Sequence, residues 1–288
     1  MGMDHASPVM VLFLVGLTAA LFGYIRSAKH TPEKLYVRRI PGIDAIEMTV
    51  GCAVEQGRPI MFTTGLTPLG PVLYACMGVL SYVARKAALL RSRLMVPQSA
   101  PDALALVEDV VSDAYRAERR LSSFDPTALV FLSDEQFAFA SGYIGMVHRE
   151  RPAAAFLFGS FAAESLILSE AGQNVGAGQV AASVSPEQVP FFVCTCDYTL
   201  IGEELFSASA YLSKEPVLLG SLYGQDRAKI FIIALLIAGI LFETSKQLAP
   251  SLATTPDIIS FLISIGWEDI GTTVTSLLST LGLSGRSL

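Results

Sequence analysis

Charged side chains are scarce in this chain, at 16% of its 288 residues against roughly 25% in ordinary soluble domains. The mean hydropathy is +0.51, so we expect part of the chain to lie in a lipid bilayer. Positive charge is scarcer than negative charge, with a formal net charge of −6, and the sequence shows no basic face. Nucleic-acid binding depends on clustered Lys and Arg, so we expect no nucleic-acid partner.

Catalytic and nucleotide-binding motifs are also missing. The chain contains no G-x-x-x-x-G-K-[ST], no G-x-G-x-x-G after a predicted strand and no G-x-S-x-G, and none of its three histidines falls at a predicted strand end. Catalytic residues and cofactors therefore remain unknown, and the sequence leaves open whether the chain is an enzyme. Its cysteines are too few for a metal site, so we predict buried, reduced thiols and no metal at Cys52, Cys76, Cys194 and Cys196.

Two apolar segments frame the chain. Residues 8–25 carry no charge and have about the ~20 residues that a transmembrane helix needs. Basic residues follow from Arg26, so the positive-inside rule places residues 1–7 outside and residues 26–227 in the cytosol. The second segment, Ile230 to Phe242 within residues 228–247, is short for a span. We prefer a crossing back to the outside, and a re-entrant or interfacial hairpin is the alternative.

The remaining residues, 248–288, alternate apolar and Ser or Thr residues, which is typical of amphipathic helices on the outer membrane face. The predicted protein is thus a multi-pass protein of the cell membrane with a cytoplasmic domain and two external termini. Both predicted spans carry small residues that allow helices to approach closely in lipid. We therefore expect a homo-oligomer that packs through Gly16, Ala20, Ala234 and Ala238.

Between the spans, strands and helices alternate five times. Short apolar runs predict strands at residues 60–63, 94–96, 128–132 and 154–158 and in the run from Val189 to Thr195. The segments between the first four runs have helical periodicity, and a Gly-rich link precedes Val189. Strands that are apolar on both faces are typical of a largely parallel sheet covered by helices. We therefore predict a Rossmann-like α/β domain with αβα layers between two transmembrane helices.

Four segments of this region resemble an uncharacterised prokaryotic family of membrane-anchored proteins that carry a domain of unknown function. The resemblance implies the anchored architecture and brings no activity, cofactor or substrate. It rests on Gly42-Ile43-Asp44-Ala45-Ile46-Glu47, Glu55-x-Gly57-Arg58-Pro59, Phe158-Gly159-Ser160-Phe161-x-x-Glu164-Ser165 and Cys196-Asp197-Tyr198-x-Leu200-Ile201-Gly202-Glu203-Glu204-Leu205-Phe206.

Small polar and acidic residues follow the predicted strands. Ligands of open α/β sheets bind outside the carboxyl ends of the strands, where helix N-termini can hold an anion or a phosphate. Alternatively, Ser, Thr and Asp serve there as helix N-caps, and Glu203 and Glu204 are favoured by the helix dipole. An acidic cluster that binds Mg²⁺ or Ca²⁺ through Glu164, Asp197, Glu203 and Glu204 is a further possibility. The candidate ligand-binding residues are Thr64, Gly65, Ser99, Ser160, Glu164, Asp197 and Glu203.

Two functions fit these observations. The first is a membrane-anchored oligomeric scaffold or sensor, whose partners are the lipid bilayer, further copies of the chain and a cytosolic protein. The second is an enzyme or small-ligand binder that uses the carboxyl-end crevice of the sheet. A bound molecule at Gly65, Ser160 and Asp197 would favour the second function, and a crevice filled by side chains would favour the first.

Overall fold

The computed structural model describes residues 41–213 and 216–252, together with residues 15, 16, 18, 19, 22, 23 and 26. The chain divides into one unit over Met1–Gln225 and another over Asp226–Leu288. Most of the predicted first span and nearly all of the predicted external tail lie outside the described residues.

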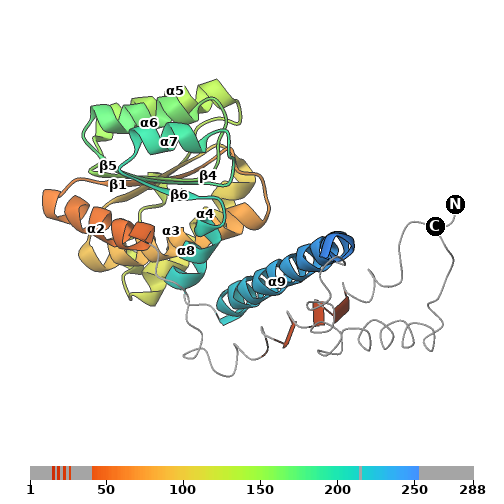
Figure 1. The fold of residues 1–288 in the computed structure, drawn as a ribbon. Helices are drawn as coiled ribbons and strands as arrows, with labels where there is room; N and C mark the ends of the chain where they lie inside the picture. Colours follow the sequence, from red (N-terminus) through yellow and green to blue (C-terminus); the bar gives the residue numbers. More distant parts are fainter. Residues whose placement is uncertain are drawn as a thin grey trace, which may run out of the picture. The chain divides into compact units, whose positions relative to one another are not determined.

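A six-stranded sheet forms the centre of the first unit (Figure 1), and all its strand pairs are parallel. The strands lie in the order β3-β2-β1-β4-β5-β6. This order places the topological switch point between β1 and β4, where a doubly wound fold usually binds its ligand. The predicted parallel α/β fold is confirmed. The strands are β1 (Ile60–Gly65), β2 (Leu94–Gln98), β3 (Leu129–Phe131), β4 (Ala154–Ser160), β5 (Gly178–Ser183) and β6 (Tyr198–Ile201).

Helices cover both faces of the sheet because its central strands are apolar on both sides. In Figure 1, α5 (Gln136–Glu150), α6 (Ser165–Asn174) and α7 (Val189–Thr195) lie over one face. The opposite face is covered by α2 (Pro41–Gln56), α3 (Pro71–Leu90), α4 (Pro101–Ala117) and α8 (Glu204–Ser213). On this face the rings of Phe62 and Phe158 stack with their centroids 5.5 Å apart.

Within the described part of the chain, one helix, α3, is long and apolar enough to cross a membrane. Its inner side is fully buried in the core of the α/β domain, as at Leu73, Val79 and Val83. The length and composition of a core helix can match those of a span, so α3 is accounted for by the fold. The predicted second span lies within α9 (Pro216–Leu252), a single helix of 37 residues.

The run from Val189 to Thr195 is a helix, α7, and not the predicted strand. Pro190 lies in its first turn, where a missing N–H is tolerated, and Phe192 alone is fully buried, edge-on to Phe161 at 5.1 Å. The structure has two strands here that were not predicted. They are β5, which includes part of the predicted Gly-rich link, and β6, which begins only at Tyr198. A short apolar run does not distinguish a buried strand from a helix by periodicity.

The prediction that all four cysteines are buried is also wrong. Cys76 is buried, Cys196 is half-buried, and Cys52 and Cys194 are exposed. Burial raises the pKa of the Cys76 thiol to about 12, and burial likewise raises the pKa of Cys196 to about 12. These two thiols are therefore protonated at neutral pH.

We predict that Cys52 and Cys194 react much faster with iodoacetamide than Cys76 does. The thiolate is the reactive form, so the raised pKa alone slows Cys76 by roughly a thousandfold at pH 8. Mass spectrometry of peptides from briefly alkylated protein measures the four rates, and protein unfolded in urea serves as the control. A Cys194 as slow as Cys76 would contradict the helix and restore the buried strand.

Candidate functional site

Five of the predicted site residues lie together at the carboxyl edge of the sheet, around the switch point. Gly65 at the end of β1 pairs in register with Ser160 at the end of β4. Ser99, directly after β2, donates a hydrogen bond from Oγ to the Gly65 carbonyl oxygen at 2.5 Å. Thr64 precedes Gly65, and Glu164 precedes the first residue of α6.

Side chains of the protein fill the space between β1 and β4. The Thr67 hydroxyl donates to the carbonyl oxygen of Thr64 and accepts from the backbone N–H of Ser160 at 2.8 Å. Beside it, Thr64 Oγ1 donates to Gln98 Oε1 at 2.5 Å. Thr64, Thr67 and Gln98 are at most 2% exposed. The hydroxyl groups of Thr64 and Thr67 and Gln98 Oε1 are thus bound within the protein, whereas the buried Gln98 Nε2 has no hydrogen-bond partner among the described residues.

Two glycines allow this close packing. Gly159 has a φ of +142°, and a Cβ at this residue would collide with Thr67 Oγ1 and the Thr64 carbonyl. At Gly65, with a φ of +60°, a Cβ would collide with the ring of Phe161. Thr67 and Phe161 were not predicted from the sequence, because the pattern does not show where their side chains point. Together they close the predicted crevice.

Glu164 is fully buried and joins two helices. Its carboxylate accepts one hydrogen bond from the backbone N–H of Ala162 at 2.9 Å and another from Gln136 Nε2 at 2.6 Å. Gln136 begins α5 and Glu164 immediately precedes α6, so the contact ties the starts of these helices together. These bonds give Glu164 a structural role.

Asp197 lies at the opposite, amino edge of the sheet, because it precedes β6 and does not follow a strand. Its Oδ2 accepts from the backbone N–H of Gln179 at 2.7 Å, and its own N–H donates to the Gln179 carbonyl at 3.1 Å. Asp197 therefore joins β6 to β5, and its predicted convergence with Glu164 and Glu203 is wrong. The error follows from the strand that was predicted at Val189–Thr195.

Glu203 follows β6 and precedes α8, at the carboxyl edge. Its carbonyl oxygen accepts from the backbone N–H of Ser207 at 3.2 Å, and the neighbouring Glu204 accepts at Oε2 from the Ile201 N–H at 3.1 Å. Both residues thus take part in the start of α8. Among the residues that the structure describes, no group of three His, Cys, Asp or Glu side chains is arranged to hold a metal ion.

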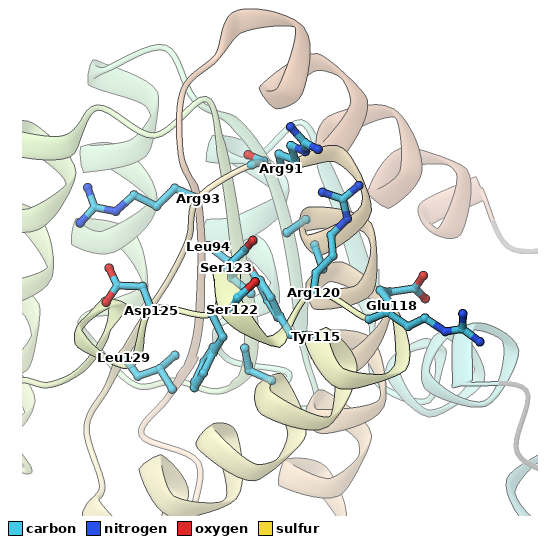
Figure 2. A pocket seen from close by; sticks show the side chains of 16 residues that line it. Arg91, Arg93, Leu94, Tyr115, Glu118, Arg120, Ser122, Ser123, Asp125 and Leu129 are labelled. Carbon is cyan, nitrogen blue, oxygen red and sulfur yellow. The ribbon is translucent and has the colours of Figure 1, made fainter.

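A cavity of about 710 Å³ lies at the amino edge of the sheet, where α3 and α4 end and β2 begins (Figure 2). We call it the arginine cavity, because four arginines line it: Arg91, Arg93, Arg119 and Arg120. Figure 2 shows Arg91 and Arg120 on one side, Arg93 and Asp125 on the other, and Ser122 and Ser123 between them.

Positive charge exceeds negative charge in the arginine cavity. Four arginines and two acids, Glu118 and Asp125, give a net charge of 4 − 2 = +2. Hydrogen bonds from the Thr127 hydroxyl and backbone N–H, with a smaller contribution from Arg93, lower the pKa of Asp125. Burial and the nearby Asp125 raise the pKa of Tyr115, which stays neutral under the cavity.

Arg93 also forms an ion pair with Glu150 at 3.1 Å, whereas no hydrogen bond or ion pair is made by the guanidinium groups of Arg91, Arg119 and Arg120 to any described residue. This basic surface does not stand out in the sequence, because its arginines come from two helix ends about thirty residues apart in the chain. The pairs Arg91-x-Arg93 and Arg119-Arg120, each directly after a helical pattern, were the available signal.

Comparison with known proteins identifies the family. The DUF6754 model, described as a domain of unknown function, matches residues 3–253. The chain belongs to this family. No curated protein and no solved structure matches the chain.

The DUF6754 match confirms the resemblance to a domain of unknown function. It extends beyond the α/β domain and includes both the apolar segment at residues 8–25 and the whole of α9. The apolar segments are therefore part of the same family unit as the sheet. The match assigns no activity or ligand to the DUF6754 domain.

We predict that Gly159→Ala lowers the free energy of unfolding by roughly 2–5 kcal/mol, because the added methyl meets backbone and strains φ. Gly176→Ala is the matched control: its φ is +69°, but a Cβ there meets nothing within 4 Å. Backbone strain alone should cost that variant about 1–2 kcal/mol. Urea unfolding of both variants measures the difference, and equal small losses would show that the crevice is open.

Proposed function

We propose that the DUF6754 domain is a membrane-anchored, oligomeric scaffold or sensor with its α/β domain in the cytosol. The observation that carries this proposal is the apolar band of α9, which we define as Ile230 to Phe242. Its large side chains are 40–65% exposed at Ile230, Phe231, Ile232, Ile233, Leu236, Ile237, Ile240 and Leu241.

The apolar band surrounds α9 on every side. Successive residues of a helix are rotated by about 100°, so four consecutive apolar residues, Ile230 to Ile233, already reach all sides. An amphipathic helix would carry a polar face here. A helix that is apolar all round is typical of a protein core or of a membrane span.

The apolar band alone is too short for a crossing, so the proposed span includes residues on either side of it. Its 13 residues extend over about 20 Å, less than the ~30 Å hydrocarbon core of a bilayer. Lys229 can extend its ammonium group towards the headgroups, and α9 continues as one helix to Leu252. A re-entrant hairpin needs a turn, and the helix has none within the band. The continuity of α9 therefore favours a crossing.

The distribution of basic residues supports the proposed orientation. Arg227 and Lys229 precede the apolar band, and Arg26 follows the apolar segment at residues 8–25. In both apolar segments, the basic residues flank the end that connects to the α/β domain. By the positive-inside rule, this favours the cytosol for the domain and the outside for both termini.

The closed carboxyl edge supports a scaffold or sensor over the alternative, an enzyme or small-ligand binder at that edge. Thr67 and Phe161 occupy the space between β1 and β4 that a ligand would need. The other surfaces of the domain stay available for a cytosolic protein or for further copies of the chain.

We predict that a fluorophore on a cysteine at Ile237 lies in lipid, whereas one at Gln225 lies in water. The chain is reconstituted in vesicles after Cys52→Ser and Cys194→Ser remove the exposed native thiols. Quenchers on lipid acyl chains should quench the probe at Ile237, and iodide should quench the probe at Gln225. Equal quenching of both probes by iodide would contradict the anchor.

We further predict that Ala234→Leu with Ala238→Leu weakens the oligomer, because these exposed small residues lie one turn apart on one side of α9. The matched control enlarges the opposite side, by Ile232→Phe with Leu236→Phe, and should leave assembly unchanged. Native mass measurement in mild detergent detects the difference. A monomeric wild-type chain would refute the proposed assembly.

A further inference from the structure

We propose that the arginine cavity binds a phosphate ester, either a soluble phosphorylated molecule or the headgroup of an anionic phospholipid. The cavity belongs to the α/β domain, so this inference does not depend on the membrane anchor. It rests on the placement of the arginines, on their lack of partners and on the apolar floor beneath them.

The backbone places two of the arginines at helix ends in an uncommon conformation, which also occurs at Arg151 after α5, outside the cavity. Arg91 ends α3 with a φ of 56°, and Arg119 follows α4 with a φ of 55°. Glycine is the usual residue in this left-handed region after a helix, because it has no Cβ. A basic residue at a helix C-terminus also complements the helix dipole. Arg93 and Arg120 add further positive charge to the same cavity.

The charges in the cavity are not balanced within the described part of the protein. Arg91, Arg119 and Arg120 have no acidic partner there, and the hydrogen bonds of Asp125 hold it to Thr127. Figure 2 shows Arg91 and Arg120 on the same side of the cavity, and an anion beside them would supply the counter-charge that these two guanidinium groups lack. The lining residues carry a net charge of +2, and the ion pair of Arg93 with Glu150 reduces it to +1, which still favours an anion.

The donors of the cavity suit phosphate oxygens. A guanidinium group can donate two parallel hydrogen bonds to a phosphate, which explains why arginine is common at phosphate sites. Ser92, Ser122 and Ser123 add three hydroxyl donors to the lining. This set of cationic and hydroxyl donors favours a phosphate over a neutral ligand.

The floor of the cavity indicates that the ligand is larger than inorganic phosphate. Tyr115 and Phe124 pack with ring centroids 5.7 Å apart, and Leu129 continues this apolar surface. A volume of about 710 Å³ is in the range of pockets that hold organic ligands. We therefore infer an ester whose phosphate meets the arginines and whose organic part covers the aromatic floor.

The test uses the full chain in detergent, titrated calorimetrically with phenyl phosphate as the soluble probe and with phenol as the uncharged control. In a second arm, the full chain is titrated with bilayer nanodiscs that contain phosphatidic acid or only phosphatidylcholine. We expect phenyl phosphate or phosphatidic acid to bind, with an affinity that falls as salt rises. Phenol and phosphatidylcholine should not bind at this site.

The decisive variant is Arg91→Gln with Arg120→Gln, which should weaken binding at least tenfold. The matched control is Arg85→Gln with Arg116→Gln, which removes the same charge outside the cavity and should bind as the wild type does. The single variant Arg120→Gln repeats the test if the double variant melts at a lower temperature. If the cavity variant loses binding of phenyl phosphate, the ligand is a soluble ester. If it loses binding of phosphatidic acid alone, the ligand is a lipid. Absence of binding in both arms, or equal binding by the cavity and control variants, would overturn the proposal.

Discussion

The close approach of β4 to β1 at Gly159 determines how the two central strands of the sheet meet at their carboxyl ends. The Thr67 hydroxyl lies against Gly159 and connects the Thr64 carbonyl to the Ser160 N–H, so the loop after β1 is held on the end of β4. This contact occurs at the switch point of a 3-2-1-4-5-6 sheet, where related architectures keep an open crevice. The same contact that stabilises the two central strands therefore removes the usual ligand site.

The amino edge of the sheet, unlike the carboxyl edge, carries a cavity. Helices in this fold end at the amino edge of the sheet, and their terminal carbonyl groups favour cations. Here α3 and α4 end in arginines that surround a cavity, and the arginines outnumber the acids that line it. In a dinucleotide-binding domain of the same strand order, the carboxyl edge is open to the ligand. In this sheet the carboxyl edge is filled by side chains, and the amino edge carries a positively charged cavity. Fold alone would have suggested the carboxyl edge as the ligand site.

The sequence predicted the fold class because β1, β2 and β4 are continuous apolar runs that only a sheet covered on both faces can bury. The strand predicted at Val189–Thr195 is wrong, because this segment is a short helix that packs on the domain through one buried side chain, Phe192. Strand β5, whose small residues Ala181 and Ala182 carry a weak strand signal, was not predicted either.

The positions of Thr64, Gly65, Ser99 and Ser160 were predicted correctly because each lies at a strand end. The filling of their crevice was not, because it depends on the side-chain directions of Thr67 and Phe161. The arginine cavity depends on contacts between segments about thirty residues apart, which a linear pattern does not reveal.

We propose that this sheet binds its ligand at the amino edge and not at the carboxyl edge. Amide hydrogen exchange of the full chain, measured with and without phenyl phosphate or phosphatidic acid nanodiscs, distinguishes the two edges because it reports on both at once. We expect slower exchange on binding in residues 91–94 and 119–125, with residues 64–70 and 159–165 unchanged. Slower exchange in residues 64–70 and 159–165, with the arginine cavity unchanged, would contradict it.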